Sequence, residues 1–156
     1  MERRSGNSQL ADSLLARALQ ECPKSGKLLA ENITTSPRVT QKNKSATAIK
    51  RNPESPLVIV AVASLFASDK KTAKARKWFE RAVVLDPDLG DSWAKYYEFE
   101  KKHGTQEQQA AVKKRCVAQE PKHGELWQAT LKAMENRHKT VEEGLELAVA
   151  KLKIAK

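Results

Sequence analysis

Basic side chains recur at helical spacing in two places, and they are the strongest candidates for a binding surface. They are Lys70, Lys74, Lys77 and Arg81 in the first place, and Lys113, Lys114 and Arg115 in the second. Side chains three or four residues apart share one face of a helix. Clustered ammonium and guanidinium groups attract carboxylates and phosphates. The pattern therefore predicts a surface for acidic protein segments or RNA, and the alternative is an ordinary solvated helix face.

No group of residues has the spacing of a catalytic or metal site. The histidines His103, His123 and His138 fall at predicted helix ends or turns. Cys22 and Cys116 lack the spacing of a zinc site or a disulfide framework, and each is predicted to be a small buried side chain at a helix end. Glycine-rich phosphate loops and nucleophile elbows are absent from the sequence. The sequence predicts neither an enzyme, a cofactor nor a small-molecule substrate.

Composition and charge favour an intracellular, non-membrane protein. The 156 residues carry a net charge of +10, and residues 1–68 and 69–156 each contribute +5. This even division favours solvated helix faces over a basic arm. The longest apolar run, residues 57–63, is far shorter than a membrane span, and no apolar stretch follows the first arginines as in a secretory signal. No motif that reads RNA bases is present.

A turn motif repeats along the chain and must position these side chains. Proline, two residues, glycine, two residues and tryptophan occur at Pro87, Gly90 and Trp93, and again at Pro121, Gly124 and Trp127. Pro23 and Pro53 begin two weaker copies, with Leu29 and Ile59 in the tryptophan place. The prolines lie 30, 34 and 34 residues apart, a period typical of helical-hairpin repeats. The chain is therefore predicted to be a stack of helix pairs.

Apolar periodicity and capping signals predict the individual helices. Capping boxes at residues 105–108 and 140–143 begin two of them. The apolar run 55–68 is compatible with a buried strand, but its length and alanine content favour a helix. The segment near 32–44 is predicted to be loop-like, and residues 1–8 to be a disordered N-terminus. The predicted helices cover residues 9–22, 25–34, 44–51, 55–68, 70–85, 89–102, 105–119, 126–134 and 141–152.

The predicted fold is all-α: a right-handed superhelical solenoid of antiparallel helix pairs over residues 9–156, with about four repeats, the first incomplete. Aromatic residues at fixed repeat positions are predicted to fill the space between helices, with partner contact as the alternative. Arg81 and Glu100 are predicted to form an ion pair within a repeat. If second helices line the concave side, the basic residues lie inside the arc.

The central repeat resembles the half-a-tetratricopeptide (HAT) repeat family. Trp93, Tyr97 and Glu100 match the first helix of the family pattern. The second helix is matched by Ala75, Arg76, Phe79, Glu80, Arg81, Ala82 and Pro87. Residues 18–23, 88–93 and 120–127 are similar to the C-terminal HAT arrays of splicing factors that bridge subunits of the tri-snRNP.

This resemblance implies a nuclear, non-catalytic scaffold in pre-mRNA splicing that contacts spliceosomal snRNP proteins, with RNA contact secondary. It also implies structural roles for Pro87, Gly90, Trp93, Tyr97, Glu100, Pro121, Gly124 and Trp127. Two alternatives remain open at this point. One is a basic helical module that binds RNA directly, and the other is a tetratricopeptide-like adaptor for peptides.

Overall fold

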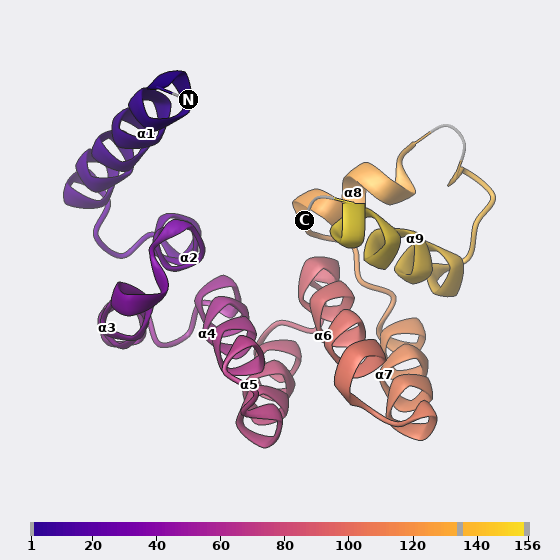
Figure 1. Ribbon diagram of the computed structural model, residues 1–156. Helices are drawn as coiled ribbons and strands as arrows, with labels where there is room; N and C mark the ends of the chain where they lie inside the picture. The colour runs from indigo at the N-terminus through magenta and orange to yellow at the C-terminus, as the bar shows by residue number, and fades with distance from the viewer. Residues whose placement is uncertain (1, 134–135, 155–156) are drawn as a thin grey trace.

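The computed structural model describes residues 2–133 and 136–154, and the named secondary-structure elements in this part of the chain are all α-helices (Figure 1). The predicted all-α helical-repeat fold is confirmed, and the right-handed superhelix stays a prediction. None of the described helices is both long and apolar enough to cross a membrane. The helices are α1 Glu2–Glu21, α2 Gly26–Thr35, α3 Arg38–Arg51, α4 Pro56–Ser68, α5 Thr72–Leu85, α6 Gly90–His103, α7 Gln106–Gln119, α8 Glu125–Leu131 and α9 Val141–Ile154.

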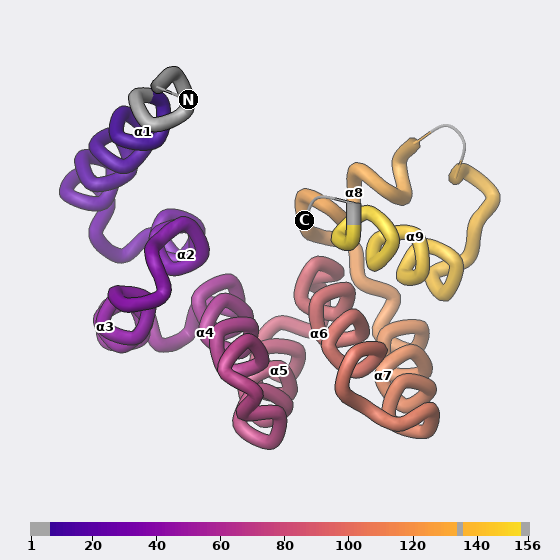
Figure 2. The backbone as a smooth tube through the Cα atoms, viewed as in Figure 1, coloured from indigo at the N-terminus to yellow at the C-terminus, as the bar shows by residue number. Residues whose placement is uncertain are grey.

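The helices follow one another as antiparallel pairs along an arc. The pairs are α2 with α3, α4 with α5, α6 with α7, and α8 with α9, while α1 packs mainly against α2. The backbone trace shows α1 projecting at one end of the arc (Figure 2). The first helices α2, α4 and α6 lie along the inside of the curve, and α3, α5 and α7 lie on its outside (Figure 1). The second helices α3, α5 and α7 therefore do not form the inner layer of the arc.

Helix α4 is buried from two directions, which explains its continuous apolar sequence. Val58, Ala61 and Val62 belong to a core shared with α1, α2 and α3. Ile59 and Ala63, on another side of the same helix, belong to the core that extends through α5 to α9. A helix that is apolar all round is a buried one. The helical interpretation of residues 55–68 is thus confirmed.

The two tryptophans of the turn motif make the same contact. The indole Nε1 of Trp93 donates to the carbonyl oxygen of Pro87 at 2.8 Å, and that of Trp127 donates to the carbonyl oxygen of Pro121 at 2.7 Å. Their exposed fractions are 1% and 0%. A buried indole needs a partner for its N–H, and the carbonyl six residues earlier supplies it. Both tryptophans are core residues, as predicted.

These two turns also dock onto each other through backbone hydrogen bonds. The N–H of Gly90 donates to the carbonyl of His123 at 2.8 Å, and Asp88 accepts from the N–H groups of Lys122 and His123. The Asp91 carboxylate accepts from the N–H groups at the start of α8, those of Leu126 and Trp127.

Gly90 is also required for space, because a Cβ there would stand 2.2 Å from ring carbons of Trp127. In the preceding turn, Pro56 occupies the place of Gly90 and has no N–H to donate.

The predicted loop over residues 32–44 is wrong, because α2 continues to Thr35 and α3 begins at Arg38. The hydroxyl groups of this polar stretch bond back to carbonyls three or four residues earlier, as from Thr35 to Glu31 and from Ser45 to Lys42. Such back-bonding keeps serine and threonine inside helices. The small residues Ser45 and Ala48 are then buried on one face of α3.

Three other expectations at the chain's ends change or fall outside the structure. Helix α1 begins at Glu2, ahead of the predicted helix start at residue 9, and the predicted disorder of residues 1–8 stays a prediction; a helix already nucleated gains one hydrogen bond per added residue. Cys22 is exposed just after α1, whereas Cys116 is buried as predicted. The predicted helix over residues 126–134 ends at Leu131 in the structure, and residue 134 is outside the described residues.

Glu100 pairs with Arg76 rather than Arg81, so the predicted ion pair is wrong. The guanidinium Nε of Arg76 donates to Glu100 Oε1 at 2.7 Å, and its Nη2 lies 3.3 Å from Oε2. Arg81 faces the outside, where it lies over the Trp78 ring at 5.4 Å. The Glu100 carboxylate is 1% exposed, so this forked pair compensates a charge that water does not reach.

Candidate functional site

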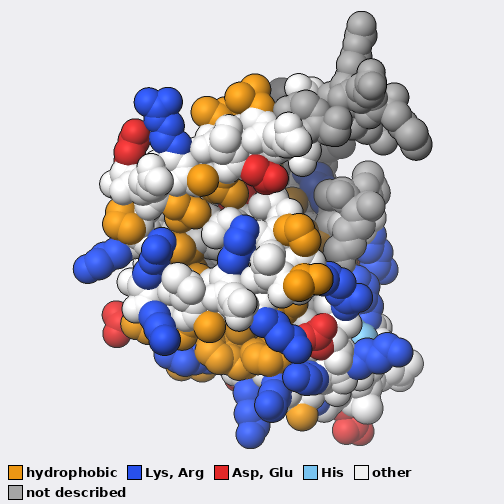
Figure 3. All heavy atoms as spheres, turned by 60° about the vertical axis from the view of Figure 1, so that its left-hand side comes forward, with side chains coloured by type: hydrophobic (Ala, Val, Ile, Leu, Met, Phe, Trp, Pro, Cys, Tyr) orange, Lys and Arg blue, Asp and Glu red, His pale blue; other side chains and the backbone are white. Residues whose placement is uncertain are grey.

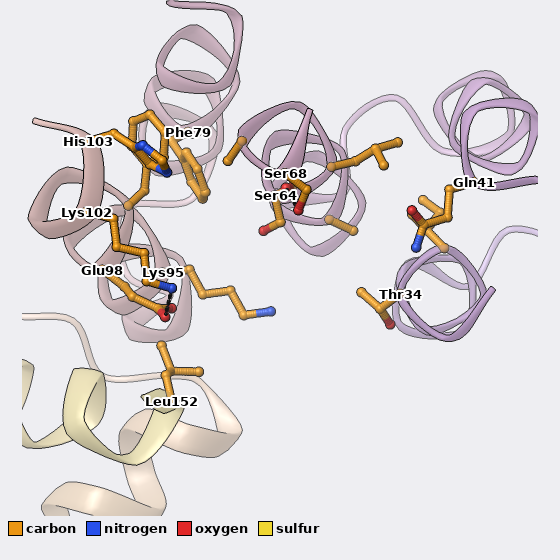
Figure 4. A pocket seen from close by; sticks show the side chains of 15 residues that line it. Thr34, Gln41, Ser64, Ser68, Phe79, Lys95, Glu98, Lys102, His103 and Leu152 are labelled. Atoms are coloured by element: carbon orange, nitrogen blue, oxygen red, sulfur yellow. Dashed lines mark hydrogen bonds and ion pairs between the residues drawn. The ribbon is translucent and has the colours of Figure 1, made fainter. Parts of the chain in front are cut away.

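A groove of about 620 Å³ runs along the inside of the arc and is the main candidate site (Figure 4). Three first helices line it: α2 with Ile33 and Thr34, α4 with Ala61, Ser64 and Ser68, and α6 with Lys95, Glu98, Phe99, Lys102 and His103. Leu152, near the end of α9, closes one end. The groove therefore collects side chains from four of the helix pairs.

The hollow follows from the small side chains that α4 presents to the inside. Ala61, Ser64 and Ser68 are three and four residues apart, so they share one face of α4. The hydroxyl of Ser64 bonds back to the carbonyl of Val60 at 2.9 Å, and that of Ser68 to the carbonyl of Ser64 at 3.0 Å. Their polar groups are satisfied within the helix, and the space above α4 stays unfilled.

The groove combines an apolar floor with a polar rim. Phe79 and Phe99 are buried beneath it with ring centroids 5.1 Å apart. On the α6 wall, Lys102 Nζ lies 2.9 Å from Glu98 Oε1, and Lys95 extends into the space between α6 and α2 (Figure 4). Protein interfaces share this plan of a buried apolar centre with a polar edge. Sequence periodicity missed this site; the signal available was the row of small residues on α4.

The predicted basic surface on α5 lies elsewhere, on the outside of the arc. Lys70, Lys74 and Lys77 are exposed there. Arg81 is exposed as well, and its Nη2 donates to the carbonyl oxygen of Pro53 at 3.4 Å. Because α5 is a second helix and second helices form the outer layer (Figure 1), this row does not face the groove.

The second predicted cluster is largely engaged in ion pairs within the chain. Lys113 Nζ lies 2.8 Å from Glu142 Oε1, and Arg115 Nη1 lies 2.7 Å from Glu80 Oε1. Partial burial opposes ionisation of Glu80, but hydrogen bonds from Arg115 and Tyr96 outweigh it and lower the pKa of this carboxyl. Lys114 is exposed. Lys113 and Arg115 thus hold α7 to α9 and α5.

The positive charge is concentrated in the middle of the chain. Residues 38–81 contain eleven Lys and Arg against three Asp and Glu, so they account for +8 of the net +10. Residues 1–68 and 69–156 each carry +5 only because the boundary at residue 68 falls inside this basic segment. The interpretation of a uniformly spread charge is therefore wrong, and the basic segment coincides with α3, α4 and α5.

Glu146 of α9 collects three donors and should govern stability in acid. Partial burial opposes its ionisation, but Lys101, the Tyr97 hydroxyl at 2.6 Å and Lys113 together lower its pKa to about 2. A depressed pKa stabilises the fold above the ordinary carboxyl value, and this contribution disappears as the pH falls toward the folded-state value.

We expect the difference in unfolding free energy between wild type and Glu146→Gln to be largest at pH 7 and to shrink between pH 4.5 and about 2. Urea unfolding followed by circular dichroism at several pH values measures it. Glu21→Gln, which alters an exposed carboxylate of α1, serves as the control. A difference that does not change with pH would contradict the role of Glu146.

Comparison with known proteins gives relatives that cover most of this chain. No family model matches it. It is 54% identical over 106 residues to Protein STABILIZED1 of Arabidopsis thaliana, which covers 68% of this chain and 10% of the relative. It is 47% identical over 116 residues to Pre-mRNA-processing factor 6 of Homo sapiens, which covers 74% and 12%.

A third relative extends the match to nearly the whole chain. Pre-mRNA-splicing factor prp1 of Schizosaccharomyces pombe is 36% identical over 149 residues, which are 96% of this chain and 16% of the relative. This chain therefore spans between a tenth and a sixth of the length of these relatives.

Proposed function

We propose that this chain, which is homologous to a segment of pre-mRNA-processing factor 6 over most of its own length, is a non-catalytic scaffold in pre-mRNA splicing. The names of the relatives assign them to pre-mRNA processing and splicing. On this proposal the chain works in the nucleus, and its partners are spliceosomal snRNP proteins. The tri-snRNP is the assembly in which it makes these contacts.

The inner groove is the observation that carries this proposal. Its apolar floor and polar rim suit a protein segment laid along the inside of the arc. Three first helices contribute to it, so the surface exists only when the pairs are stacked. Solenoids bind partners on extended concave surfaces of this kind. The function is thus assigned to shape and surface, with no reacting group required.

Blocking the groove should remove protein partners without unfolding the chain. Ser64→Arg places a long charged side chain over the small face of α4, and we expect at least a fivefold loss of recovered splicing proteins, about 1 kcal/mol of binding free energy. Tagged full-length chain incubated in nuclear extract, with nuclease treatment and mass spectrometry, measures the recovery. Recovery that survives nuclease indicates protein contacts.

The matched control is Ser13→Arg, because the Ser13 hydroxyl also bonds back within its helix, to the carbonyl of Leu10 at 2.8 Å, and lies outside the groove. The control should recover splicing proteins as wild type does. Equal recovery with Ser64→Arg would exclude the groove as the binding surface. Recovery of peptide-binding complexes instead of splicing proteins, in a parallel incubation with cytoplasmic extract, would support the adaptor alternative.

A further inference from the structure

Helices α3 and α5 are tied together at both ends on the outside of the arc. At the start of α3, Arg38 donates to the carbonyl oxygen of Ser68 at 3.2 Å and pairs with Asp69 at 3.7 Å, in the turn that leads into α5. At the other end, Arg81 of α5 donates to the carbonyl oxygen of Pro53, just beyond α3. The two second helices thus run in the same direction across one outer face.

This face carries a positive charge that its own carboxylates do not neutralise. Helix α3 contains no Asp or Glu, Asp69 is paired with Arg38, and Glu80 of α5 is paired with Arg115. The remaining carboxylate of residues 38–81 is Glu54, exposed in the turn after α3. Lys and Arg side chains predominate among the charged groups on this side of the molecule (Figure 3). We define the basic face by its exposed residues Lys42, Lys50, Lys70, Lys74 and Lys77.

The middle of the basic face lacks the apolar anchors of a protein interface. Residues 42–51 and 70–81 expose no large hydrophobic side chain, whereas Val39 at the start of α3 and Val84 and Leu85 at the end of α5 are exposed. Protein–protein contacts depend on buried aromatic and aliphatic anchors at their centre. Nucleic-acid contacts depend instead on cations that neutralise phosphates. Charge without an apolar centre therefore favours a polyanion over a folded protein partner.

We propose that the basic face of α3 and α5 binds the phosphate backbone of RNA, at a site separate from the inner groove. Lys74 and Lys77 are separated along α5 by about 4.5 Å, as follows from a helical rise of about 1.5 Å per residue, and Lys70 lies in the turn just before α5. Their ammonium groups on flexible stems act as point charges for successive phosphates. The binding is independent of base sequence and falls steeply with salt.

The test measures binding of the full chain to a fluorescein-labelled 20-nucleotide uridine RNA by fluorescence anisotropy. The variant combines Lys70→Gln, Lys74→Gln and Lys77→Gln. At 100 mM KCl we expect its Kd to rise about tenfold, and the slope of log affinity against log salt to become shallower by about 2, the value for three lost single-strand phosphate contacts. The corresponding triple Lys→Arg variant keeps the charge and should keep the affinity.

The matched control combines Lys122→Gln, Lys132→Gln and Lys151→Gln, three exposed lysines outside the face, and should change Kd by less than about threefold. Equal losses in both triple glutamine variants would overturn the proposal, because net charge alone would then explain binding. Polyglutamate that competes as well as unlabelled RNA would overturn it in favour of an acidic protein. This assay contains only the chain and the RNA. Its outcome therefore does not depend on whether the groove binds splicing proteins.

Discussion

Replacing Trp93 by alanine is expected to lower the free energy of unfolding by about 3–5 kcal/mol. The side chain is 1% exposed and lies in the core that joins α4 to α9. Its removal leaves a cavity the size of an indole and frees the carbonyl of Pro87 from its hydrogen bond. Urea unfolding followed by circular dichroism measures the change, and an unaltered midpoint would show that Trp93 does not hold the stack together.

Two further variants separate the contributions at this position. Trp93→Phe keeps most of the buried ring but loses the N–H donor, so we expect a smaller loss of about 1–2 kcal/mol. Trp78→Ala removes a tryptophan that is only half-buried, between Phe66 and Arg81. Its cost should be clearly below that of Trp93→Ala. A larger cost would mean that the packing between α4 and α5 dominates the stability.

Replacing Arg76 by methionine is expected to destabilise the fold by about 3 kcal/mol, the lower end of the range for breaking a buried ion pair. The loss comes from the Glu100 carboxylate, which is 1% exposed and would lose its compensating charge. The lower end applies because the Arg76 side chain is itself 31% exposed. The free energy of unfolding in urea at neutral pH measures this effect.

The double variant Arg76→Met with Glu100→Met should recover part of the loss, since apolar replacements of a buried pair are often tolerated. Arg81→Met tests the partner that sequence spacing suggested. It should cost less than about 1 kcal/mol, because Arg81 is exposed and makes only a ring contact and one long hydrogen bond. If Arg81→Met costs more than Arg76→Met, the assignment of the pair is wrong.

The turn motif made most of the helices predictable from sequence. Proline ends one helix, and the apolar period of the next begins within a few residues, as at Pro87 and Trp93. Capping boxes located α7 and α9, and both hydrogen bonds of each box are present at Thr105 and Thr140. These signals are local, so the sequence contains them without any knowledge of the neighbouring helices.

The failures arose where helices meet or where polar residues stay helical. Helix α3 has few apolar residues, and its Ser and Thr hydroxyls bond to its own backbone, which periodicity does not reveal. Helical spacing predicts that Arg76 and Arg81 lie on the same helix. It does not predict which of them is near Glu100, which belongs to the next helix. The groove could not be predicted from sequence, because it forms only where α2, α4 and α6 come together in the fold. The basic row was found from sequence, but its side of the arc was not.

Because of Pro56, the helix pair α4–α5 cannot make the hydrogen bonds that the pair α6–α7 makes to the next turn. The helix pairs are therefore not interchangeable. The turn at Gly90 offers a backbone N–H and the Asp91 carboxylate to the turn that follows it. The turn at Pro56 offers neither, because Leu57 stands where Asp91 would be. Shuffling the pair α4–α5 into the place of α6–α7 would leave the first amides of α8 without acceptors. Each pair is thus specific to its position, unlike a module of a consensus repeat array.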